Sequence, residues 1–275
     1  MDKRKLAIVD IETGEMITDG SASIRFKNQA EGYRKYIDKE RYKYETKDRH
    51  WVASYHGPIA KISEELTLTE AGAIIKLLPY MRFKAGGKLI SDGKPLKQAD
   101  IQRIFRRGRT ATARILNVLE GKGVINVQKE GRNNLFYIST EFHEIGSVRA
   151  SENFTKVYQA KTREITDKLE LHEAGILYKI IPYFHYERYY LCANPDEPDR
   201  EKIRYINRKE LAAIVGLNPD DVTRVVAKLR RLGALMSTKS GVTTRYLVHP
   251  DFMFRQAKET EWTKAVRQMF EAHGR

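Results

Sequence analysis

Apolar residues recur at helical spacing in two stretches of the chain that match each other. The stretches are LTLTEAGAIIKLLPYMRF (66–83) and LELHEAGILYKIIPYFHY (169–186), and 8 of their 18 positions are identical at an offset of 103 residues. Each predicts a helix with a proline near its C-terminal end, over Thr69–Met81 and His172–Phe184. So long a match is far above chance, so the chain contains an internal repeat.

The repeat resumes after a loop, over 96–142 and 206–252, at an offset of 110 residues. In both copies the pattern predicts a short helix, a tight turn, a third helix that ends at a glycine, and two strands around a polar turn. Asn218 followed by Pro219 is a strong helix-start signal, because Asn caps a helix and Pro fits its first turn. The predicted helices cover Gln98–Phe105 and Arg208–Val215 (short), then 110–120 and Pro219–Arg231 (third).

A helix, a helix-turn-helix and a hairpin in this order are typical of a winged helix-turn-helix. The expected fold is therefore mainly α with small β wings, of the α+β class. It would contain two tandem winged helix-turn-helix domains that arose by internal duplication. The expected boundaries are an N-terminal hairpin and Tyr/Lys-rich extension (1–65), the first winged helix (66–146), a linker (147–168), the second winged helix (169–252) and a C-terminal amphipathic helix (253–275).

The charge indicates the partner. The chain has 50 Lys and Arg against 36 Asp and Glu, a net charge of +14, and residues 66–146 alone hold 14 basic and 7 acidic side chains. Such an excess favours binding to a polyanion, most often nucleic acid. In a winged helix-turn-helix the third helix enters the major groove and the hairpin reaches the adjacent backbone or minor groove. We therefore expect double-stranded DNA as the partner.

The first copy has the stronger DNA-binding chemistry. The residues expected to contact DNA lie in the turn and the N-terminal half of the third helix: Arg106, Arg107, Arg109, Thr110, Thr112, Ala113 and Arg114. The hairpin adds Lys129, Arg132, Asn133 and Asn134. Arginine can form two hydrogen bonds to guanine, and the methyl groups of Thr and Ala can touch thymine. We expect Arg109 and Arg114 to lead base recognition, while Lys129 and Arg132 hold the DNA backbone.

The second copy has the same pattern with weaker chemistry. Asp220 and Asp221 stand in the first turn of its third helix, where carboxylates favour the helix dipole but repel phosphates. The residues that could still contact DNA are Arg208, Lys209, Thr223, Arg224, Lys239, Thr243, Thr244 and Arg245. The second copy is thus either a weaker reader or a protein-contact module. Two unequal readers in one chain could engage an asymmetric or directly repeated site.

Both ends of the chain leave alternatives open. Segment 33–56 alternates tyrosines with charged residues, which suits either base stacking or a small strand-rich subdomain against the first copy. The pattern around Thr13–Gly14 predicts a hairpin. The C-terminal amphipathic helix could pack on the duplicated core or form a homodimer contact.

Catalytic and metal-binding motifs are not part of the pattern. The seven histidines include no His-hydrophobic-His pair of the kind a rolling-circle nickase needs, and Cys192 is the single cysteine. GGKLIS (86–91) lacks the flanking residues of a phosphate-binding loop. We therefore expect no enzyme activity, cofactor or metal. With no signal peptide or membrane span in the pattern, we expect a cytoplasmic protein that associates with the bacterial nucleoid through DNA.

The third helices resemble those of MarR-type winged helices. The strings that support this are TATARILNVLEGKGVI and NPDDVTRVVAKLRRLGAL; Thr223 and Arg224 match the Thr-Arg pair of that pattern, whereas Ala113 replaces the threonine in the first copy. Residues 7–146 also resemble plasmid replication proteins of the RepL type from Firmicutes, through IVDIETGEMI and the closing strand at ISTEFHEIG. The resemblance implies a plasmid or phage protein, either a replication initiator or a transcriptional regulator (repressor) at an operator. An RNA-binding regulator and a protein-binding scaffold remain the alternatives.

Overall fold

The computed structural model describes residues 13, 50–131, 133–149, 151–240 and 243–273. The chain divides into two units, Met1–Asp48 and Arg49–Arg275, and every described residue except Thr13 belongs to the second. The predicted N-terminal hairpin, most of segment 33–56 and Arg132 lie outside the described residues.

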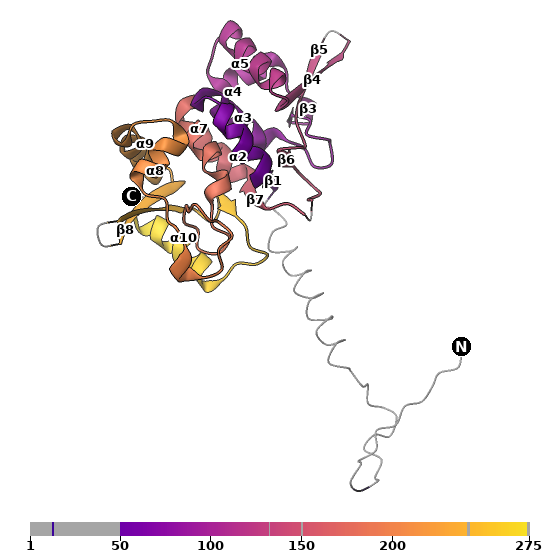
Figure 1. Ribbon diagram of the computed structural model, residues 1–275. Helices are drawn as coiled ribbons and strands as arrows, with labels where there is room; N and C mark the ends of the chain where they lie inside the picture. The colour runs from indigo at the N-terminus through magenta and orange to yellow at the C-terminus, as the bar shows by residue number, and fades with distance from the viewer. Residues whose placement is uncertain (1–12, 14–49, 132, 150, 241–242, 274–275) are drawn as a thin grey trace. The chain divides into compact units, whose positions relative to one another are not determined.

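The elements of the second unit come in two rounds of similar order (Figure 1). The first round, called the first repeat (51–144), contains β1 (Trp51–Tyr55), α2 (His56–Glu65), α3 (Leu68–Leu77), η1 (Leu78–Tyr80), β2 (Ile90–Ser91), β3 (Lys94–Pro95), α4 (Gln98–Phe105), α5 (Arg109–Gly121), β4 (Ile125–Glu130), β5 (Asn133–Ile138) and β6 (His143–Glu144). The second repeat (154–254) contains β7 (Phe154–Tyr158), α6 (Gln159–Thr166), α7 (Leu171–Lys179), η2 (Ile181–Tyr183), η3 (Arg200–Lys202), α8 (Arg208–Val215), α9 (Pro219–Arg231), β8 (Leu235–Ser240), β9 (Thr243–Val248) and β10 (Met253–Phe254), and α10 (Glu261–His273) follows it. The protein is thus α+β with small antiparallel sheets.

Local sequence signals account for the main helix boundaries. The predictions for α4, α8 and α9 are confirmed to the residue, and Asn218 caps α9 by accepting hydrogen bonds from two backbone N–H groups. The helices predicted to reach Met81 and Phe184 instead end earlier and continue as the short 3₁₀ turns η1 and η2. Proline causes this change, because Pro79 and Pro182 have no N–H to donate and would clash with the carbonyl four residues earlier in an α-helix.

The repeats begin earlier in the sequence than predicted. Segment 147–168, which the sequence suggested was a linker, contains β7 and α6. They correspond at the offset of 103 residues to β1 and α2, which the sequence placed in the N-terminal extension. Each repeat therefore opens with a strand and a helix of its own.

A central antiparallel sheet, in the order β10-β7-β1-β6, joins the two repeats. Trp51 of β1 lies opposite Tyr158 of β7, and Tyr55 lies opposite Phe154. Phe154 and Tyr158 are the residues that the repeat makes equivalent to Trp51 and Tyr55. The two central strands, β1 and β7, are therefore counterparts of each other and pair in antiparallel orientation.

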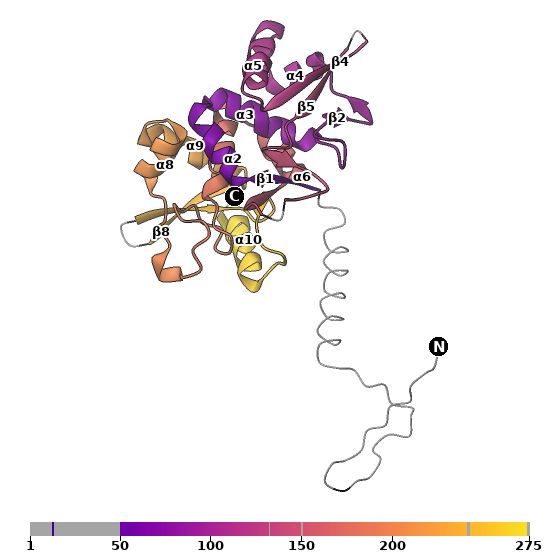
Figure 2. The same ribbon diagram turned by 45° about the vertical axis from the view of Figure 1, so that its right-hand side comes forward.

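The edge strands follow the same rule. Ala53 of β1 pairs with Glu144 of β6, and their counterparts Lys156 of β7 and Phe254 of β10 pair in the same way. An approximate two-fold axis therefore relates the two repeats. The hairpins β4–β5 and β8–β9 accordingly extend from opposite sides of the unit (Figures 1 and 2).

Helices α3 and α7 pack against each other at the centre of the unit (Figure 1). Gly72 of α3 lies against the backbone of Leu171, and Gly175 of α7 lies against the backbone of Leu68. Buried apolar side chains of both repeats form one continuous cluster around this contact. The repeats therefore share a core.

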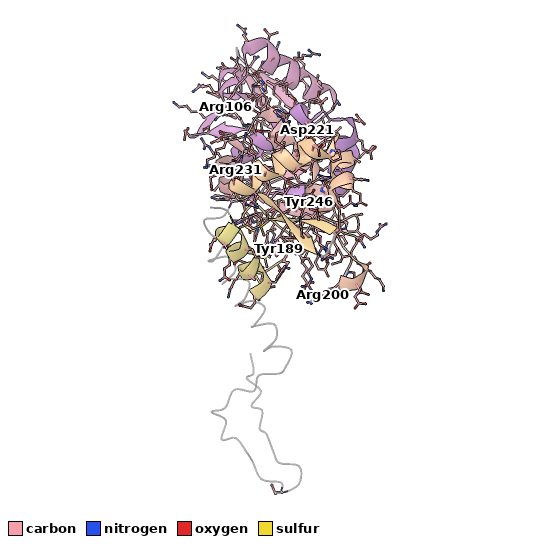
Figure 3. The ribbon with its side chains drawn as sticks, turned by 90° about the vertical axis from the view of Figure 1, so that its left-hand side faces the viewer. Arg106, Tyr189, Arg200, Asp221, Arg231 and Tyr246 are labelled. Carbon is pink, nitrogen blue, oxygen red and sulfur yellow. The ribbon has the colours of Figure 1, made fainter. Side chains whose placement is uncertain are left out.

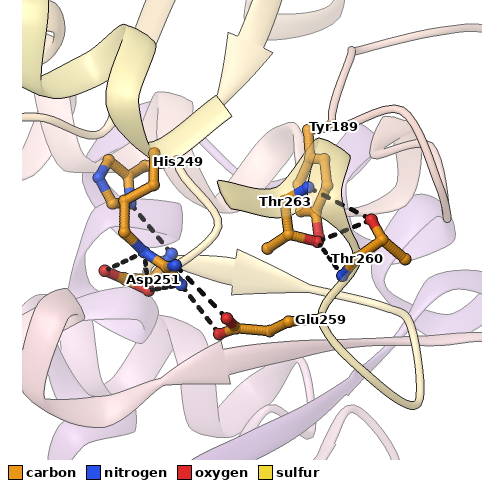
Figure 4. Close-up of polar contacts among 7 residues, drawn as sticks. Tyr189, His249, Asp251, Glu259, Thr260 and Thr263 are labelled. Atoms are coloured by element: carbon orange, nitrogen blue, oxygen red, sulfur yellow. Dashed lines mark hydrogen bonds and ion pairs between the residues drawn. The ribbon is translucent and has the colours of Figure 1, made fainter. Parts of the chain in front are cut away.

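The C-terminal helix α10 packs on the second repeat. Its residues Val266 and Phe270 are buried, and the Tyr189 hydroxyl lies 2.8 Å from the Thr263 hydroxyl (Figure 4). Arg267 forms ion pairs with Asp251 and with Glu259 near the start of the helix. The apolar face that the sequence offered for either the core or a dimer contact is thus used within the chain. Among the described residues, no helix is long and apolar enough to span a membrane.

Candidate nucleic-acid interface

In each repeat a left-handed residue ends the helix before the tight turn. In the second repeat this residue is Gly216, with φ 73°, and in the first it is Arg106, with φ 53°. Both open the turn between two helices, α8–α9 and α4–α5. Glycine adopts this conformation freely, whereas arginine is strained in it.

Arg106 and Arg107, predicted to contact DNA, make contacts to the second repeat. The Arg106 guanidinium donates to the carbonyl oxygen of Asp167, and Arg107 forms a 3.0 Å ion pair with Glu170. Asp167 and Glu170 flank the turn between α6 and α7. The two arginines therefore hold the α4–α5 turn against the other repeat.

The prediction that Thr112 faces outward is wrong. Its side chain is fully buried, and its hydroxyl lies 3.4 Å from the carbonyl oxygen of Arg107. The reason is helical spacing: position 112 lies three, four and seven residues before the buried Ile115, Leu116 and Leu119. Thr112 thus extends the apolar stripe of α5 by one turn.

The opposite side of α5 faces solvent and borders an open groove of about 740 Å³. Its lining residues, which define the α5 groove, are Gln98, Arg109, Thr110, Ala113, Arg114, Asn117 and Val118. Four of the predicted DNA-contacting residues, Arg109, Thr110, Ala113 and Arg114, are therefore brought together on one face. Gln98 at the start of α4 closes the groove on the neighbouring helix.

The first hairpin lies beside this groove. Arg109 also borders a second hollow, together with Gln102 of α4 and with Asn133 and Asn134 of β5. Lys129 of β4 is exposed and lies opposite Asn134 in the hairpin ladder. Arg109, one of the two predicted base-reading arginines, therefore lies beside both α4 and the hairpin asparagines.

Acidic neighbours distinguish α9 from α5. In α9, Arg224 forms a 2.5 Å ion pair with Asp221, and Arg208 of α8 lies 3.7 Å from Asp220. In the part of the chain that the structure describes, neither Arg109 nor Arg114 has a carboxylate within 4.0 Å. The predicted contrast between the copies is therefore present in the side-chain geometry.

The second repeat has a larger open groove, of about 1060 Å³, between α9 and its hairpin. Its lining residues, which define the α9 groove, are Asn207, Arg208, Lys209, Thr223, Val226, Ala227, Arg230, Arg231, Ser237, Lys239, Thr244 and Tyr246. Five of these side chains are basic and none is acidic. Figure 3 shows Arg231 and Tyr246 on the face of the molecule that carries α9.

A further ion pair fixes α9 to the shared core. Lys228 lies 2.5 Å from Glu173, in the first turn of α7. Burial opposes ionisation of Glu173, but hydrogen bonds from Lys228 and from the backbone N–H of Glu170 outweigh it, so the pKa of Glu173 is lowered. The carboxylate therefore stays charged and holds the buried side of α9 in place.

The other predicted residues of the second hairpin have mixed positions. Lys239 and Thr244 line the α9 groove. Arg245 instead stacks over the ring of Tyr205, with its guanidinium carbon 4.0 Å from the ring centre. The side chain of Thr243, like the whole of Arg132, lies outside the described residues.

Several groove residues were missed from the sequence. Arg230 and Arg231 lie on the hairpin side of α9, and Gln98 and Asn117 border the α5 groove. Helical spacing could have found Arg230, because it stands seven residues after Thr223 and three after Ala227 on the same face. The predicted DNA contacts cover only the N-terminal half of each third helix, whereas the α9 groove extends to the last turn of α9.

No group of three or more His, Cys, Asp or Glu that could hold a metal ion occurs within the residues that the structure describes. Comparisons of the chain with protein-family models, with curated proteins and with solved structures gave no match.

Proposed function

We propose that this chain is a sequence-specific double-stranded DNA-binding protein built from two tandem winged helix-turn-helix units. The observation that supports this most is the exposed face of α5, where Arg109 and Arg114 have no carboxylate neighbour among the described residues and Arg109 also adjoins the hairpin asparagines. The net charge of +14 provides the general attraction to phosphates.

The α5 groove has the chemistry of base recognition. A helix about 10–12 Å in diameter fits the major groove, which is about 12 Å wide. Thr110 and Ala113 are small enough to let the helix approach closely, and the forked guanidinium of Arg109 or Arg114 can bond guanine O6 and N7. Lys129 and Asn134, on the hairpin, are suited to the adjacent backbone or minor groove.

The α9 groove has the chemistry of backbone binding. Its cations lie at the start of α8, at the last turn of α9 and on the hairpin, represented by Lys209, Arg230 and Lys239. The first turn of α9 instead carries Asp220 and Asp221, which would repel phosphates. We therefore assign base reading mainly to the first repeat and backbone anchoring mainly to the second.

The resemblance to RepL-type proteins extends the proposal to replication initiation on a plasmid or phage. A transcriptional regulator at an operator would use the same protein–DNA contacts. An initiator binds its origin and distorts or melts nearby A·T-rich DNA, whereas a repressor only occupies its site. Permanganate reactivity of thymines beside the bound site distinguishes the two roles.

Selection of bound duplexes from a random library tests the proposal. We expect the bound duplexes to share a discrete motif. Unlabelled DNA duplex that carries this motif should compete for binding, and RNA of the same sequence should not. Recovery of no motif, together with weak binding at moderate salt, would contradict the proposal and favour a protein-binding scaffold. Equal competition by RNA would favour an RNA-binding regulator.

A further inference from the structure

The two-fold relation between the repeats constrains the DNA that a single chain can address. Strand β1 pairs with its own counterpart β7 in reverse direction, so exchanging the repeats returns the same register. The contact of Gly72 with Leu171 is likewise exchanged with that of Gly175 with Leu68. Both sets of contacts are reciprocal. The operation that superimposes one repeat on the other is therefore a rotation by half a turn without translation.

Two equivalent binding sites on one straight duplex are related in only two ways. Direct repeats are related by a screw operation, which combines rotation about the DNA axis with a translation of about 3.4 Å per base pair. Inverted repeats are related by a two-fold axis perpendicular to the DNA axis, as when dimer symmetry matches a palindromic operator. A two-fold axis without translation is compatible only with the second arrangement.

We propose that one chain binds two half-sites in inverted orientation, with the α5 groove on one and the α9 groove on the other. This inference rests on the proposed function. It differs from the directly repeated site, which the sequence offered as an alternative to an asymmetric one. It also makes a single chain geometrically similar to a homodimer, because the shared α3–α7 core lies where a dimer interface would otherwise be.

The two half-sites differ in sequence content. Arg109 has Pro219 as its counterpart in the second repeat, and the counterpart of Arg114 is Arg224, which is paired with Asp221. The half-site under α5 is therefore read by base contacts. The half-site under α9 is held mainly through its phosphates. The selected motif should therefore be well defined in one half and weakly defined in the other. For this reason the inverted arrangement cannot be recognised from the motif sequence alone.

Site-directed DNA cleavage tests the orientation. Gln128 in β4 and Thr238 in β8 occupy equivalent positions of the two hairpins, so Gln128→Cys and Thr238→Cys each allow attachment of an iron–EDTA probe. Native Cys192 does not compete, because it is buried and burial raises its pKa to about 12. The full-length variants are bound, one at a time, to the best selected duplex, and their affinity is measured first.

We expect one zone of cleavage from each probe, at different positions on the duplex. If the two half-sites are inverted, the probes at Thr238→Cys and Gln128→Cys should cut opposite DNA strands more strongly. Zones related by simple translation on the same strand would overturn the inference, and so would cleavage from Gln128→Cys alone. In both of those cases DNA binding itself stands. Failure of both variants and of the unmodified chain to bind any selected duplex would instead contradict the proposed function.

Discussion

Gly72 of α3 lies so close to Leu171 of α7 that a β-carbon at position 72 would stand 1.8 Å from the Leu171 carbonyl oxygen. A β-carbon at Gly175 would stand 2.0 Å from the carbonyl oxygen of Leu68, which is the symmetry-related contact. The absence of side chains at these two positions lets α3 and α7 approach closely enough to share one core. The arrangement of the two grooves depends on this contact.

Gly72→Ala should therefore destabilise the protein. The new methyl group meets backbone rather than a movable side chain, so α3 and α7 must separate, at a cost of about 3 kcal/mol or more. Urea unfolding of the full chain measures the loss. Gly57→Ala is the matched control, because Gly57 lies in α2 with nothing within 4 Å of an added β-carbon. Equal stability of the two variants would contradict the close approach.

Arg109→Ala and Arg114→Ala should each weaken binding to the selected duplex by about 1–3 kcal/mol and relax specificity at one position. The physical reason is loss of a two-pronged hydrogen bond to a base. Arg103→Ala is the matched control: Arg103 is an exposed arginine of α4, paired with Asp100, and borders neither the α5 groove nor the hollow beside the hairpin. Fluorescence anisotropy with the selected duplex and its single-base variants gives both quantities. Unchanged specificity in both test variants would remove α5 as the reading element.

Arg230→Ala, Arg231→Ala and Lys239→Ala should weaken binding by similar factors on every duplex sequence. Each lost phosphate contact lowers the slope of log affinity against log salt by about 0.9. Arg200→Ala, in the exposed turn η3 outside the α9 groove, should leave that slope unchanged. If instead the α9 variants alter the preferred sequence, the second repeat reads bases and the division of roles is wrong.

Buried histidines should make the protein less stable in mild acid. Burial lowers the pKa of His143, and that of His56 also through the charge of Arg255, from 6.5 to about 3. Between pH 6.5 and pH 3 the unfolded chain takes up protons that the folded chain does not. Stability is therefore full above pH 6.5 and falls as the pH drops below it, by up to about 1.4 kcal/mol per pH unit for each histidine.

His143→Met tests this account, because Met253 is the counterpart of His143 in the second repeat. The variant loses the 2.9 Å hydrogen bond between His143 and Ser54, so we expect lower stability at pH 7, by about 1–3 kcal/mol. Its stability should nevertheless depend less steeply on pH between 6.5 and 5, as measured by urea unfolding at each pH. The same steepness in variant and parent would show that His143 titrates normally in the folded protein.

Sequence patterns predicted the bounds of three helices well and the surroundings of their side chains less well. The first and last residues of α4, α8 and α9 match the prediction, because capping residues such as Asn218 and turn residues such as Gly216 fix helix ends through local contacts. The outward position of Thr112 was mispredicted, since threonine is common on both exposed and buried faces. The contacts of Arg106 and Arg107 depend on the other repeat, and no local pattern encodes them.

The two-fold symmetry between the repeats could not be predicted from the sequence either. An offset of 103 residues identifies a duplication, but it does not distinguish two domains in tandem from two that pair strand to strand. That choice depends on β1 and β7, whose sequences WVASY and FTKVY share only their final tyrosine. The sequence pattern alone therefore places β1 in an N-terminal extension and β7 in a linker.

Titration of the full chain with the best selected duplex, and with a shuffled duplex of the same length and composition in the same salt, measures sequence-specific DNA binding. We expect tighter binding to the selected duplex by a factor of about 10³ or more, with both affinities falling as salt rises. Equal affinity for the two duplexes, or no binding to either, would contradict it.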